Sequence, residues 1–467
     1  MNKKRIIMIL ALLIALLAMT ACSKDDQKPD STTTETTEAA SETREIDFDA
    51  EGIAAKFLDT FMAESFPEML INFTYSDEMK EQFTVEAMEA IHKQIIKAFG
   101  SFEGTYGLKT TEQSEYYIVS IGGNHVDKDL VYNIVFNYDG KIAGFNYQEI
   151  SSVEDYFDAE IDNANEFEVT FGEAPFEING TLSIPKEGNG PFPVVVLVHG
   201  SGPNDRNESI YVNKPFKDIA TGLIDKGVAV LRYDKRTYTH LEKFNDPTLA
   251  ADFTIYDEVV DDAVYAVEFL KNYEGIDPNH IFVAGHSLGG NQAPRIADAT
   301  KDVAGIAVLA GNVTPLQKLI VTQYKYLLGL DGSLDDNDQK QIESIEKASN
   351  LISSDEMTLD TDMSLTLGLA PKYWMDIKDY NPVELAATLN IPILILQGSR
   401  DYQVPVDEFK LWQQGLGDKA DYKEYSDLNH LFMTGEGMSK PEEYTVAAHV
   451  SSEMINDLAD WVLENSK

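Results

Sequence analysis

Hydrophobic positions between residues 165 and 467 follow two alternating patterns. Short, uninterrupted apolar runs rich in β-branched residues occur at four places: 194–198, 281–284, 303–310 and 391–396. Runs of this kind are typical of strands that are covered on both faces, as in a parallel sheet. Between Asp257 and Leu270 the apolar residues instead recur every three or four positions, which predicts an amphipathic helix. Strands that alternate with helices predict β-α-β units and an α/β fold.

The first third of the chain has a different organisation. Its periodic segments, two helical and then two strand-like, lie at 53–61, 85–99, 114–121 and 130–147. Two helices followed by an antiparallel sheet predict a small α+β domain over residues 50–150, with a hairpin turn at Asp139-Gly140. Neither His92 nor His125 has the spacing of a metal ligand, and we expect both side chains to face solvent.

The first 22 residues have the pattern of a secretory signal. Three basic residues precede an apolar run at 6–19, which is too short for a committed membrane span. The run ends at Cys22, which follows a small residue and resembles the bacterial lipobox. We therefore expect a lipoprotein signal peptide over 1–22 and a lipid anchor on Cys22, on the extracytoplasmic face of a bacterial cell membrane. The alternative is an ordinary signal peptide with an incidental cysteine.

Residues 23–49 are rich in serine, threonine and acidic residues and have almost no apolar residues before Ile46. Such a segment cannot bury enough apolar surface to fold, so a disordered tether is expected there. Because Cys22 is the only cysteine of the chain, disulfides cannot contribute to stability.

The charge of the chain limits its partners. Its 37 basic and 79 acidic residues give a formal net charge of -42. A field of this sign repels phosphate polymers, so we expect no nucleic-acid partner, and anionic polymers are disfavoured for the same reason. Neutral or cationic small molecules are easier to admit. The oligomeric state cannot be inferred from the sequence.

One apolar run ends in a motif that carries chemistry. The run at 281–284 continues into Gly285-His286-Ser287-Leu288-Gly289, and a helix-compatible segment follows. A serine hydroxyl is a poor nucleophile, so its backbone must hold it in a strained turn, and small residues two positions away on each side allow strand and helix to close around it. This pattern predicts Ser287 as the nucleophile at a strand-to-helix elbow.

A second strand end predicts a site for negative charge. The run at 194–198 leads directly into His199-Gly200-Ser201-Gly202, and a glycine-rich turn leaves backbone amides free to point at a developing oxyanion. We interpret the amides of Ser201 and Leu288 as the oxyanion hole. The alternative is an ordinary tight turn between strand and helix.

Four other polar residues lie in or beside these two motifs. We interpret His199 and His286 as residues that pack and form hydrogen bonds rather than perform chemistry. Asp205 and Arg206 are interpreted as an ion pair that braces the loop. Recognition of a substrate carboxylate is the alternative role for Arg206.

The base and acid of the predicted site come from the last part of the chain. Asp401 lies in the loop after the apolar run at 391–396, and His430 lies in the segment 421–432, which we interpret as a strand and a loop. The order serine, aspartate, histidine is that of the hydrolases built on an α/β sheet. We predict that His430 transfers the proton and that Asp401 orients its ring. Asp407 and Asp427 are the rivals, the first in a predicted helix and the second too close to His430 in sequence.

Together these motifs show a family resemblance. Residues 165–467 resemble the α/β-hydrolase superfamily, and the runs HGSGPNDR and GHSLGG resemble its bacterial esterase and serine-aminopeptidase-like branch. The resemblance implies a mostly parallel eight-stranded sheet flanked by helices, and hydrolysis with no metal and no organic cofactor. Residues 50–150 resemble a small domain of unassigned function that precedes some secreted bacterial hydrolases.

The chain departs from a bare hydrolase core in one segment. About 80 residues separate Gly311 from Ile391, where one helix and its loops would suffice. We interpret residues 312–388 as a helical cap insertion over the active site that determines substrate shape. A helical decoration elsewhere on the surface is the alternative. The acidic run from Asp335 to Asp338 lacks the pattern of a calcium loop and is interpreted as a solvated helix start.

The sequence therefore supports three functions in decreasing order. The first is a carboxylesterase that cleaves small or medium acyl esters through a Ser-His-Asp triad and an acyl-enzyme. The second is a peptidase or amidase, because the same triad serves either reaction and the pocket decides. The third is a surface binding protein that has lost activity, which the intact set Ser287, Asp401 and His430 disfavours.

Overall fold

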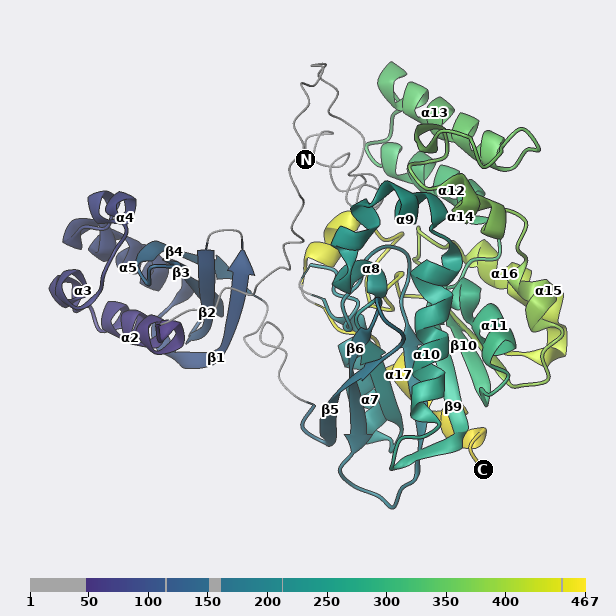
Figure 1. Ribbon diagram of the computed structural model, residues 1–467, viewed down its shortest axis with the longest axis horizontal. Helices are drawn as coiled ribbons and strands as arrows, with labels where there is room; N and C mark the ends of the chain where they lie inside the picture. Colours follow the sequence, from purple (N-terminus) through teal and green to yellow (C-terminus); the bar gives the residue numbers. More distant parts are fainter. Residues whose placement is uncertain (1–47, 114–115, 151–160, 212, 447) are drawn as a thin grey trace, which may run out of the picture. The chain divides into compact units, whose positions relative to one another are not determined.

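The computed structural model describes residues 48–467, with the exception of 114–115, 151–160, 212 and 447. The expected signal peptide, the lipidation of Cys22 and the tether up to residue 47 lie outside the described residues. The described residues form two compact units, the first over residues 48–150 and the second over residues 161–467 (Figure 1). No helix in these residues is both long enough and apolar enough to cross a membrane.

The first unit packs helices on one face of an antiparallel sheet with strand order β1-β2-β3-β4. Its elements are α2 (Ala50–Met62), α3 (Phe66–Asn72), α4 (Asp77–Gln82), α5 (Val85–Phe99), β1 (Phe102–Gln113), β2 (Tyr116–His125), β3 (Leu130–Asn137) and β4 (Ile142–Glu149). Phe57 and Phe61 of α2 are fully buried, and both rings contact Phe145 of β4 edge-on. This aromatic layer gives the unit a hydrophobic core of its own.

The structure corrects two expectations for this unit. Four helices precede the sheet rather than two, because α3 and α4 are too short to show a hydrophobic period. His92 and His125 are buried, with exposed fractions of 7% and 5%, rather than solvent-facing. The ring of His125 lies within hydrogen-bond distance of the Tyr132 hydroxyl and the Gly100 carbonyl, so its polar atoms are satisfied inside the core.

The second unit is built on an eight-stranded sheet with strand order β12-β11-β10-β9-β7-β8-β6-β5. Its strands are β5 (Ala164–Phe171), β6 (Ile178–Pro185), β7 (Phe192–Val198), β8 (Ala229–Tyr233), β9 (Ile276–His286), β10 (Gly305–Leu309), β11 (Ile393–Gly398) and β12 (Asp421–Tyr425). Only the pairings of β6 with β5 and with β8 are antiparallel. The predicted fold class, a mostly parallel eight-stranded sheet preceded by a small α+β domain, is confirmed.

Helices cover both faces of this sheet (Figure 1). One face packs against α7 (Pro215–Asp225) and α17 (Ser452–Glu464), and the other against α10 (Asp261–Leu270), α11 (Leu288–Thr300), α15 (Pro382–Ala386) and α16 (Val406–Leu416). Val194 and Val196 belong to one core and Val195 and Leu197 to the other. Because successive strand residues point to opposite faces, two covered faces require the uninterrupted apolar runs seen in the sequence.

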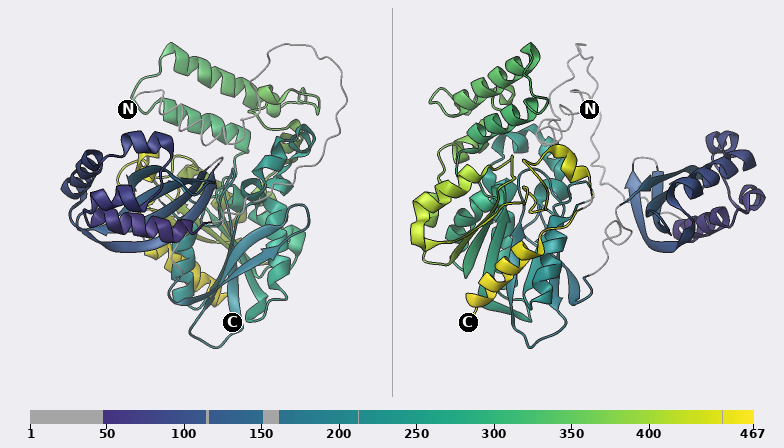
Figure 2. Two further views of the ribbon diagram at one scale, coloured as in Figure 1. Left: turned by 60° about the vertical axis from the view of Figure 1, so that its left-hand side comes forward. Right: turned by 180° about the vertical axis from the view of Figure 1, so that it is seen from behind.

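Most of the segment between β10 and β11 forms a helical cap, but α15 packs on the sheet beside α11 and α16, so the cap ends before the expected residue 388. Its helices are α12 (Leu316–Leu328), α13 (Asp336–Ile352) and α14 (Pro371–Ile377), and Figure 2 shows α12 and α13 at the end of the unit opposite the C-terminus. Asp335 caps α13 by accepting from the amides of Asn337 and Asp338, so the acidic run begins a helix as expected. Two shorter helices, α8 (Arg236–Thr239) and α9 (Pro247–Asp252), follow β8.

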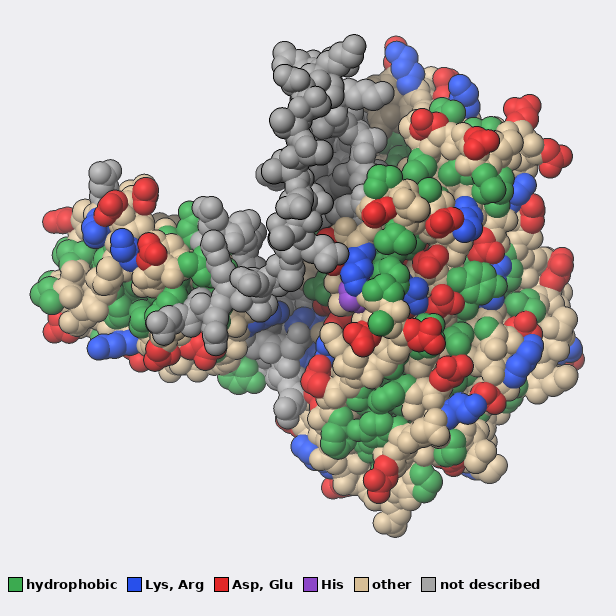
Figure 3. Space-filling model, viewed as in Figure 1, with side chains coloured by type: hydrophobic (Ala, Val, Ile, Leu, Met, Phe, Trp, Pro, Cys, Tyr) green, Lys and Arg blue, Asp and Glu red, His purple; other side chains and the backbone are tan. Residues whose placement is uncertain are grey.

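The acidic excess is a property of the surface. Figure 3 shows acidic side chains spread over the visible face of the second unit rather than gathered in one patch, with lysines and arginines between them. The excess therefore does not mark a single acidic docking site on that face.

Candidate active site

Ser287 occupies a strained turn between β9 and α11. Its φ of 53° and ψ of -117° lie in a region that side-chain-bearing residues rarely adopt. The turn is closed so tightly that a Cβ at Gly285 would lie 2.2 Å from the Gly289 carbonyl oxygen, and one at Gly289 would lie 2.3 Å from that of Val198. Both flanking glycines are therefore required by the approach of backbone to backbone, as the sequence motif predicts.

His430 and Asp401 form a buried hydrogen-bonded pair. Asp401 Oδ2 lies 2.6 Å from His430 Nδ1, and both residues are at least 95% buried. Asp401 Oδ1 accepts from the amides of Gln403 and Val404, at 2.7 and 2.9 Å. The carboxylate is thus fixed by its own loop, and its contact with Nδ1 leaves Nε2 of His430 without the ring proton and able to accept one.

The three predicted side chains come together at the carboxyl edge of the sheet. Ser287 and His430 line the same cavity, and Asp401 lies behind His430. The rival acids are elsewhere: Asp407 is exposed on α16, where it pairs with Lys410, and Asp427 is exposed. The geometry therefore favours Asp401 over both rivals.

Ser201 and Leu288 line a cavity together with Ser287. The amides on each side of Ser201 are taken, since Gly200 donates to Glu208 and Gly202 donates to Glu258. Within the described residues, no acceptor takes the amide of Ser201 itself. The amide of Leu288 starts α11 and has no partner inside the helix. These two donors are therefore available to an oxyanion.

Buried side chains hold the glycine-rich loop between them. Lys235 Nζ donates to the Gly200 carbonyl at 2.8 Å and lies 3.5 Å from Glu258 Oε1. Glu258 accepts from the Gly202 amide at 2.8 Å and from the Tyr373 hydroxyl at 2.6 Å. Burial lowers the pKa of Lys235, and the carboxylate of Glu258 opposes this shift. Because Tyr373 belongs to α14, these contacts join the cap to the loop that carries Ser201.

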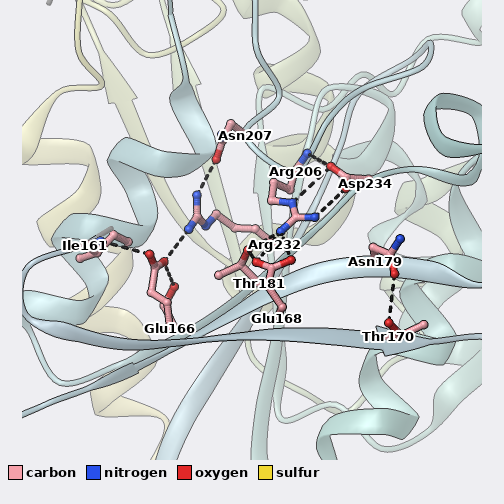
Figure 4. Close-up of polar contacts among 11 residues, drawn as sticks. Ile161, Glu166, Glu168, Thr170, Asn179, Thr181, Arg206, Asn207, Arg232 and Asp234 are labelled. Atoms are coloured by element: carbon pink, nitrogen blue, oxygen red, sulfur yellow. Dashed lines mark hydrogen bonds and ion pairs between the residues drawn. The ribbon is translucent and has the colours of Figure 1, made fainter. Parts of the chain in front are cut away.

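Two arginines brace the continuation of this loop (Figure 4). Arg206 pairs with Asp234 at 2.8 Å and with Glu168 at 2.7 Å, rather than with Asp205 as the sequence analysis expects. Arg232 donates to Asn207 and pairs with Glu166 at 2.8 Å. The partners are at least 25 positions away in the sequence, which is why local spacing could not identify them. Neither arginine lines a cavity beside Ser287, so a role in recognising a substrate carboxylate is not supported.

His199 packs and donates as the sequence analysis expects. Its Nε2 lies 2.9 Å from the Asp205 carbonyl oxygen, and its ring contacts those of Phe216 and Tyr233. The side chain is fully buried, and this burial lowers the pKa of His199 to about 4. The ring is therefore neutral near pH 7 and supports the start of the loop without taking part in proton transfer.

A second histidine lies directly beside the ring of His430. His286 is 95% buried, and the centres of the His286 and His430 rings are 4.6 Å apart. Its Nδ1 lies 2.8 Å from Glu208 Oε2, and its Nε2 lies 2.9 Å from the His430 carbonyl oxygen. Burial alone would lower the pKa of His286, but the facing Glu208 carboxylate outweighs it and raises the pKa. Burial likewise opposes ionisation of Glu208, yet His286 keeps its pKa below the ordinary value.

Two cavities meet at Ser287. The cap-side cavity has a volume of about 90 Å³ and is lined mainly by apolar residues of the cap, among them Leu316, Leu319, Ile320, Leu367, Tyr373 and Trp374. The loop-side cavity has a volume of about 260 Å³, and its lining includes Asn204, Ser209, Tyr211, Gln403, His430 and Tyr444. Only the loop-side cavity includes His430 in its lining.

Several functional contacts were not found by sequence reasoning. Glu208, Glu258 and Lys235 hold the glycine-rich loop, and Gln397 donates to Asp401 at 3.2 Å. A glutamate in a polar loop has the pattern of a solvated residue, so the sequence had no signal for the burial of Glu208. The described residues contain no group of three or more His, Cys, Asp or Glu side chains arranged to hold a metal ion.

Comparison with known families divides the chain as the structure does. A family described as "Alpha/beta hydrolase family" matches residues 195–448, which include Ser201, Ser287, Asp401 and His430. A family described as "Protein of unknown function (DUF3887)" matches residues 54–145 of the first unit.

Individual relatives were found for both sequence and structure. The chain is 35% identical to Esterase EstD of Thermotoga maritima over 423 residues, which cover 89% of this chain and 96% of that protein. It is 28% identical to isoprenylcysteine alpha-carbonyl methylesterase of Arabidopsis thaliana over 37% of this chain and 39% of that protein. The solved structure of Est1E from Butyrivibrio proteoclasticus aligns over 64% of this chain and 98% of that chain, with a TM-score of 0.42 and 16% identity.

Proposed function

Because the chain belongs to the alpha/beta hydrolase family, we propose that it is a serine esterase that cleaves small or medium acyl esters. One observation carries this proposal: Asp401 holds Nδ1 of His430, while His430 and the strained Ser287 line one cavity. The relative EstD, which is named an esterase, spans nearly the whole chain and supports the choice of ester substrates.

The first half of the reaction forms an acyl-enzyme. Ser287 Oγ attacks the ester carbonyl carbon while Nε2 of His430 takes the hydroxyl proton. The carbonyl oxygen becomes negatively charged and accepts from the amides of Ser201 and Leu288. Collapse of this intermediate breaks the bond to the leaving alcohol, which receives the proton from His430.

The second half of the reaction releases the acid. Water replaces the alcohol, and His430 removes its proton as the oxygen attacks the acyl carbon. The same two amides stabilise the second intermediate, and Ser287 leaves with the proton that His430 returns. Asp401 stabilises the imidazolium of His430 in both halves without taking its proton.

The position of His430 indicates which part of the ester each cavity binds. The leaving alcohol must lie next to the group that protonates it, so the alcohol occupies the loop-side cavity, which His430 lines. The acyl chain then occupies the cap-side cavity. At about 90 Å³ this cavity is smaller than the roughly 150 Å³ cavity that takes up benzene, so it suits a short apolar chain.

The charges in the cap-side cavity, which takes the acyl group, favour neutral esters over amino-acid derivatives. Among the described residues, neither cavity has a lysine or arginine in its lining. Glu258 is the one carboxylate of the cap-side cavity, and it already binds the Gly202 amide and the Tyr373 hydroxyl and lies beside Lys235. It is therefore not free to bind the ammonium group of an aminoacyl substrate, which disfavours the peptidase alternative.

The proposal is tested by labelling and by a pair of substrates. A fluorophosphonate probe should modify the wild-type protein, and the protein should hydrolyse p-nitrophenyl acetate and butyrate. Aminoacyl p-nitroanilides should be hydrolysed far more slowly. Preference for the anilides would favour the peptidase, and a protein that neither reacts with the probe nor cleaves any of these substrates would favour the inactive binding protein.

Filling the cap-side cavity should shorten the acyl chain that is accepted. We expect Ile320→Trp to lower the ratio of kcat/KM for p-nitrophenyl butyrate to that for acetate by about 10-fold or more, since a pocket discriminates by roughly 10-fold or more per methylene. The measurement is the initial rate of p-nitrophenol release over a series of acyl lengths.

Two matched variants control for this effect. Ile210→Trp, in the loop-side cavity, should change the preference among butyrate esters of different alcohols and leave the acyl preference unchanged. Leu334→Trp, at an exposed cap position, should change neither. An acyl preference that shifts in Ile210→Trp but not in Ile320→Trp would reverse the assignment of the two cavities.

We also propose that the mature chain is attached to the extracytoplasmic face of a bacterial membrane by lipid on Cys22. The apolar run before Cys22 and the polar segment after it support this proposal. We expect Cys22→Ala to move the protein from the membrane fraction to the soluble fraction and to abolish incorporation of an alkyne-labelled fatty acid. Unchanged fractionation of this variant would contradict lipid anchoring.

A further inference from the structure

Glu208 lies at the centre of the catalytic loops although it contacts no reacting atom. It follows Asn207, which Arg232 holds, and it adopts a left-handed backbone conformation with φ of 50°. Its side chain is 97% buried, and Oε1 accepts from the Gly200 amide at 2.6 Å. The carboxylate is therefore fixed from two directions, by its own loop and by the glycine-rich loop that carries Ser201.

The second oxygen of Glu208 reaches the nucleophile elbow. Oε2 lies 2.8 Å from Nδ1 of His286, the residue immediately before Ser287. The other ring nitrogen of His286 lies 2.9 Å from the backbone carbonyl oxygen of His430. Two hydrogen bonds and the ion-pair contact between Glu208 and His286 thus connect Gly200, Ser287 and His430, which belong to three loops far apart in the sequence.

The chemistry of these contacts defines the protonation of the pair. A carbonyl oxygen can only accept, so Nε2 of His286 must carry a proton. Nδ1 lies 2.8 Å from a carboxylate oxygen of Glu208, and the nearby negative charge favours a second proton on the His286 ring. The raised pKa of His286 and the lowered pKa of Glu208 agree with an imidazolium and a carboxylate. Attraction between opposite charges is stronger in a buried site than in water, and it restricts movement of both partners.

We propose that Glu208 and His286 form a positioning pair that sets the Ser201 amide and the His430 ring relative to Ser287. The proposal rests on the proposed function and adds two residues that act through others. The loop and the nucleophile are in direct contact, since a Cβ at Gly200 would lie 3.1 Å from Ser287 Cβ. Any displacement of Gly200 therefore moves the neighbouring Ser201 amide with respect to the oxyanion. Movement of His286 would likewise shift the His430 backbone that it binds.

Two variants of Glu208 distinguish a positioning role from a purely structural one. One truncates the side chain, and the other removes its charge. In Glu208→Ala the Gly200 amide and His286 lose their acceptor, and we expect kcat per active site to fall by about 10²- to 10³-fold, the effect of losing one oxyanion donor. KM should change less than kcat, because the cap-side cavity keeps its lining and Glu208 is one of many residues that line the loop-side cavity. In Glu208→Gln the amide oxygen can accept from Gly200 and the amide nitrogen can donate to neutral His286, so at least 10-fold of the lost rate should return.

The measurement is kcat for p-nitrophenyl butyrate, divided by the number of sites that a fluorophosphonate labels at completion. Asp262→Asn is the matched control, because Asp262 is also fully buried, accepts from a backbone amide and pairs with a cation, Arg236, yet lines neither cavity. We expect this variant to melt at a lower temperature and to keep wild-type kcat per labelled site.

Two results would overturn the positioning role. One is a Glu208→Ala enzyme whose kcat per labelled site stays within twofold of wild type, and the other is an equal loss of kcat in Asp262→Asn. If Glu208→Ala does not fold, Glu208→Asp decides, since its shorter carboxylate cannot reach Gly200 and His286 together and should lower kcat at least 10-fold. An unchanged kcat in Glu208→Asp would then contradict the proposal. Failure of the proposed function is a distinct result, in which the wild-type protein itself has no esterase activity.

Discussion

Ser287→Ala is expected to lower kcat for ester hydrolysis by about 10⁶-fold, the largest effect of any single change in this chain. Without the hydroxyl no acyl-enzyme can form, and only the oxyanion amides of Ser201 and Leu288 remain to stabilise charge. The measurement is the rate of p-nitrophenol release at saturating p-nitrophenyl butyrate, with the wild type assayed at a correspondingly lower concentration.

The fold of the Ser287→Ala variant should remain intact, because alanine has the same backbone constraints as serine in the elbow. Thermal melting and far-UV circular dichroism of the variant check this expectation. Loss of fluorophosphonate labelling should accompany the loss of turnover. Labelling that persists in Ser287→Ala would mean that another residue is the nucleophile.

Asp401→Asn is expected to lower kcat by about 10⁴-fold while the protein stays folded. The Gln403 and Val404 amides donate to Oδ1, so the oxygen of an asparagine must occupy that position and its amide nitrogen must face His430. Nδ1 of His430 then has to accept, and the ring proton moves to Nε2. An imidazole in this tautomer cannot take the proton of Ser287. Steady-state kinetics with p-nitrophenyl butyrate measure the loss.

Asp407→Asn and Asp427→Asn are the controls for the assignment of the acid. Both carboxylates are exposed, and both variants should keep wild-type kcat. The assignment of Asp401 would be wrong if its asparagine variant lost less than about 10-fold and one of these two variants lost the larger share.

Much of the candidate site could be predicted because it lies at strand ends. Ser287, Asp401 and His430 each follow an apolar or alternating segment, and parallel strands bring their carboxyl ends to one edge of the sheet. The elbow motif adds a local constraint, since Gly285 and Gly289 are needed wherever this turn is made. Residue type, local pattern and chain order were sufficient for these predictions.

The supporting contacts could not be predicted because their partners are distant in sequence. Glu258 meets the Gly202 amide 56 positions away, and Tyr373 reaches Glu258 over 115 positions. In the first unit, the expectation that His125 faces solvent was wrong, because the sheet brings the Tyr132 hydroxyl to its ring. The strand β1 contains two glycines and little alternation, and it is a strand because β2 pairs with it.

The cap was predicted in part from the sequence, and its role beside Ser287 became visible in the structure. Sequence length alone revealed an insertion between β10 and β11, and helical periodicity predicted α12. Only the structure decided that this insertion forms one wall of a cavity next to Ser287 and that His430 belongs to the opposite cavity. The assignment of acyl and alcohol sides follows from that division.

By itself the sequence determined the α/β architecture, the candidate residues for nucleophile, base and acid, and the existence of an insertion between two strands. These properties depend on hydrophobic period, glycine placement and chain order. Each can be seen in neighbouring residues or in the order of motifs along the chain. The tertiary structure alone decided which polar groups are buried together, and therefore that Glu208, His286, Lys235 and Glu258 hold the catalytic loops. A buried hydrogen bond depends on the distance between two atoms in space, and no local pattern specifies that distance for residues on separate loops.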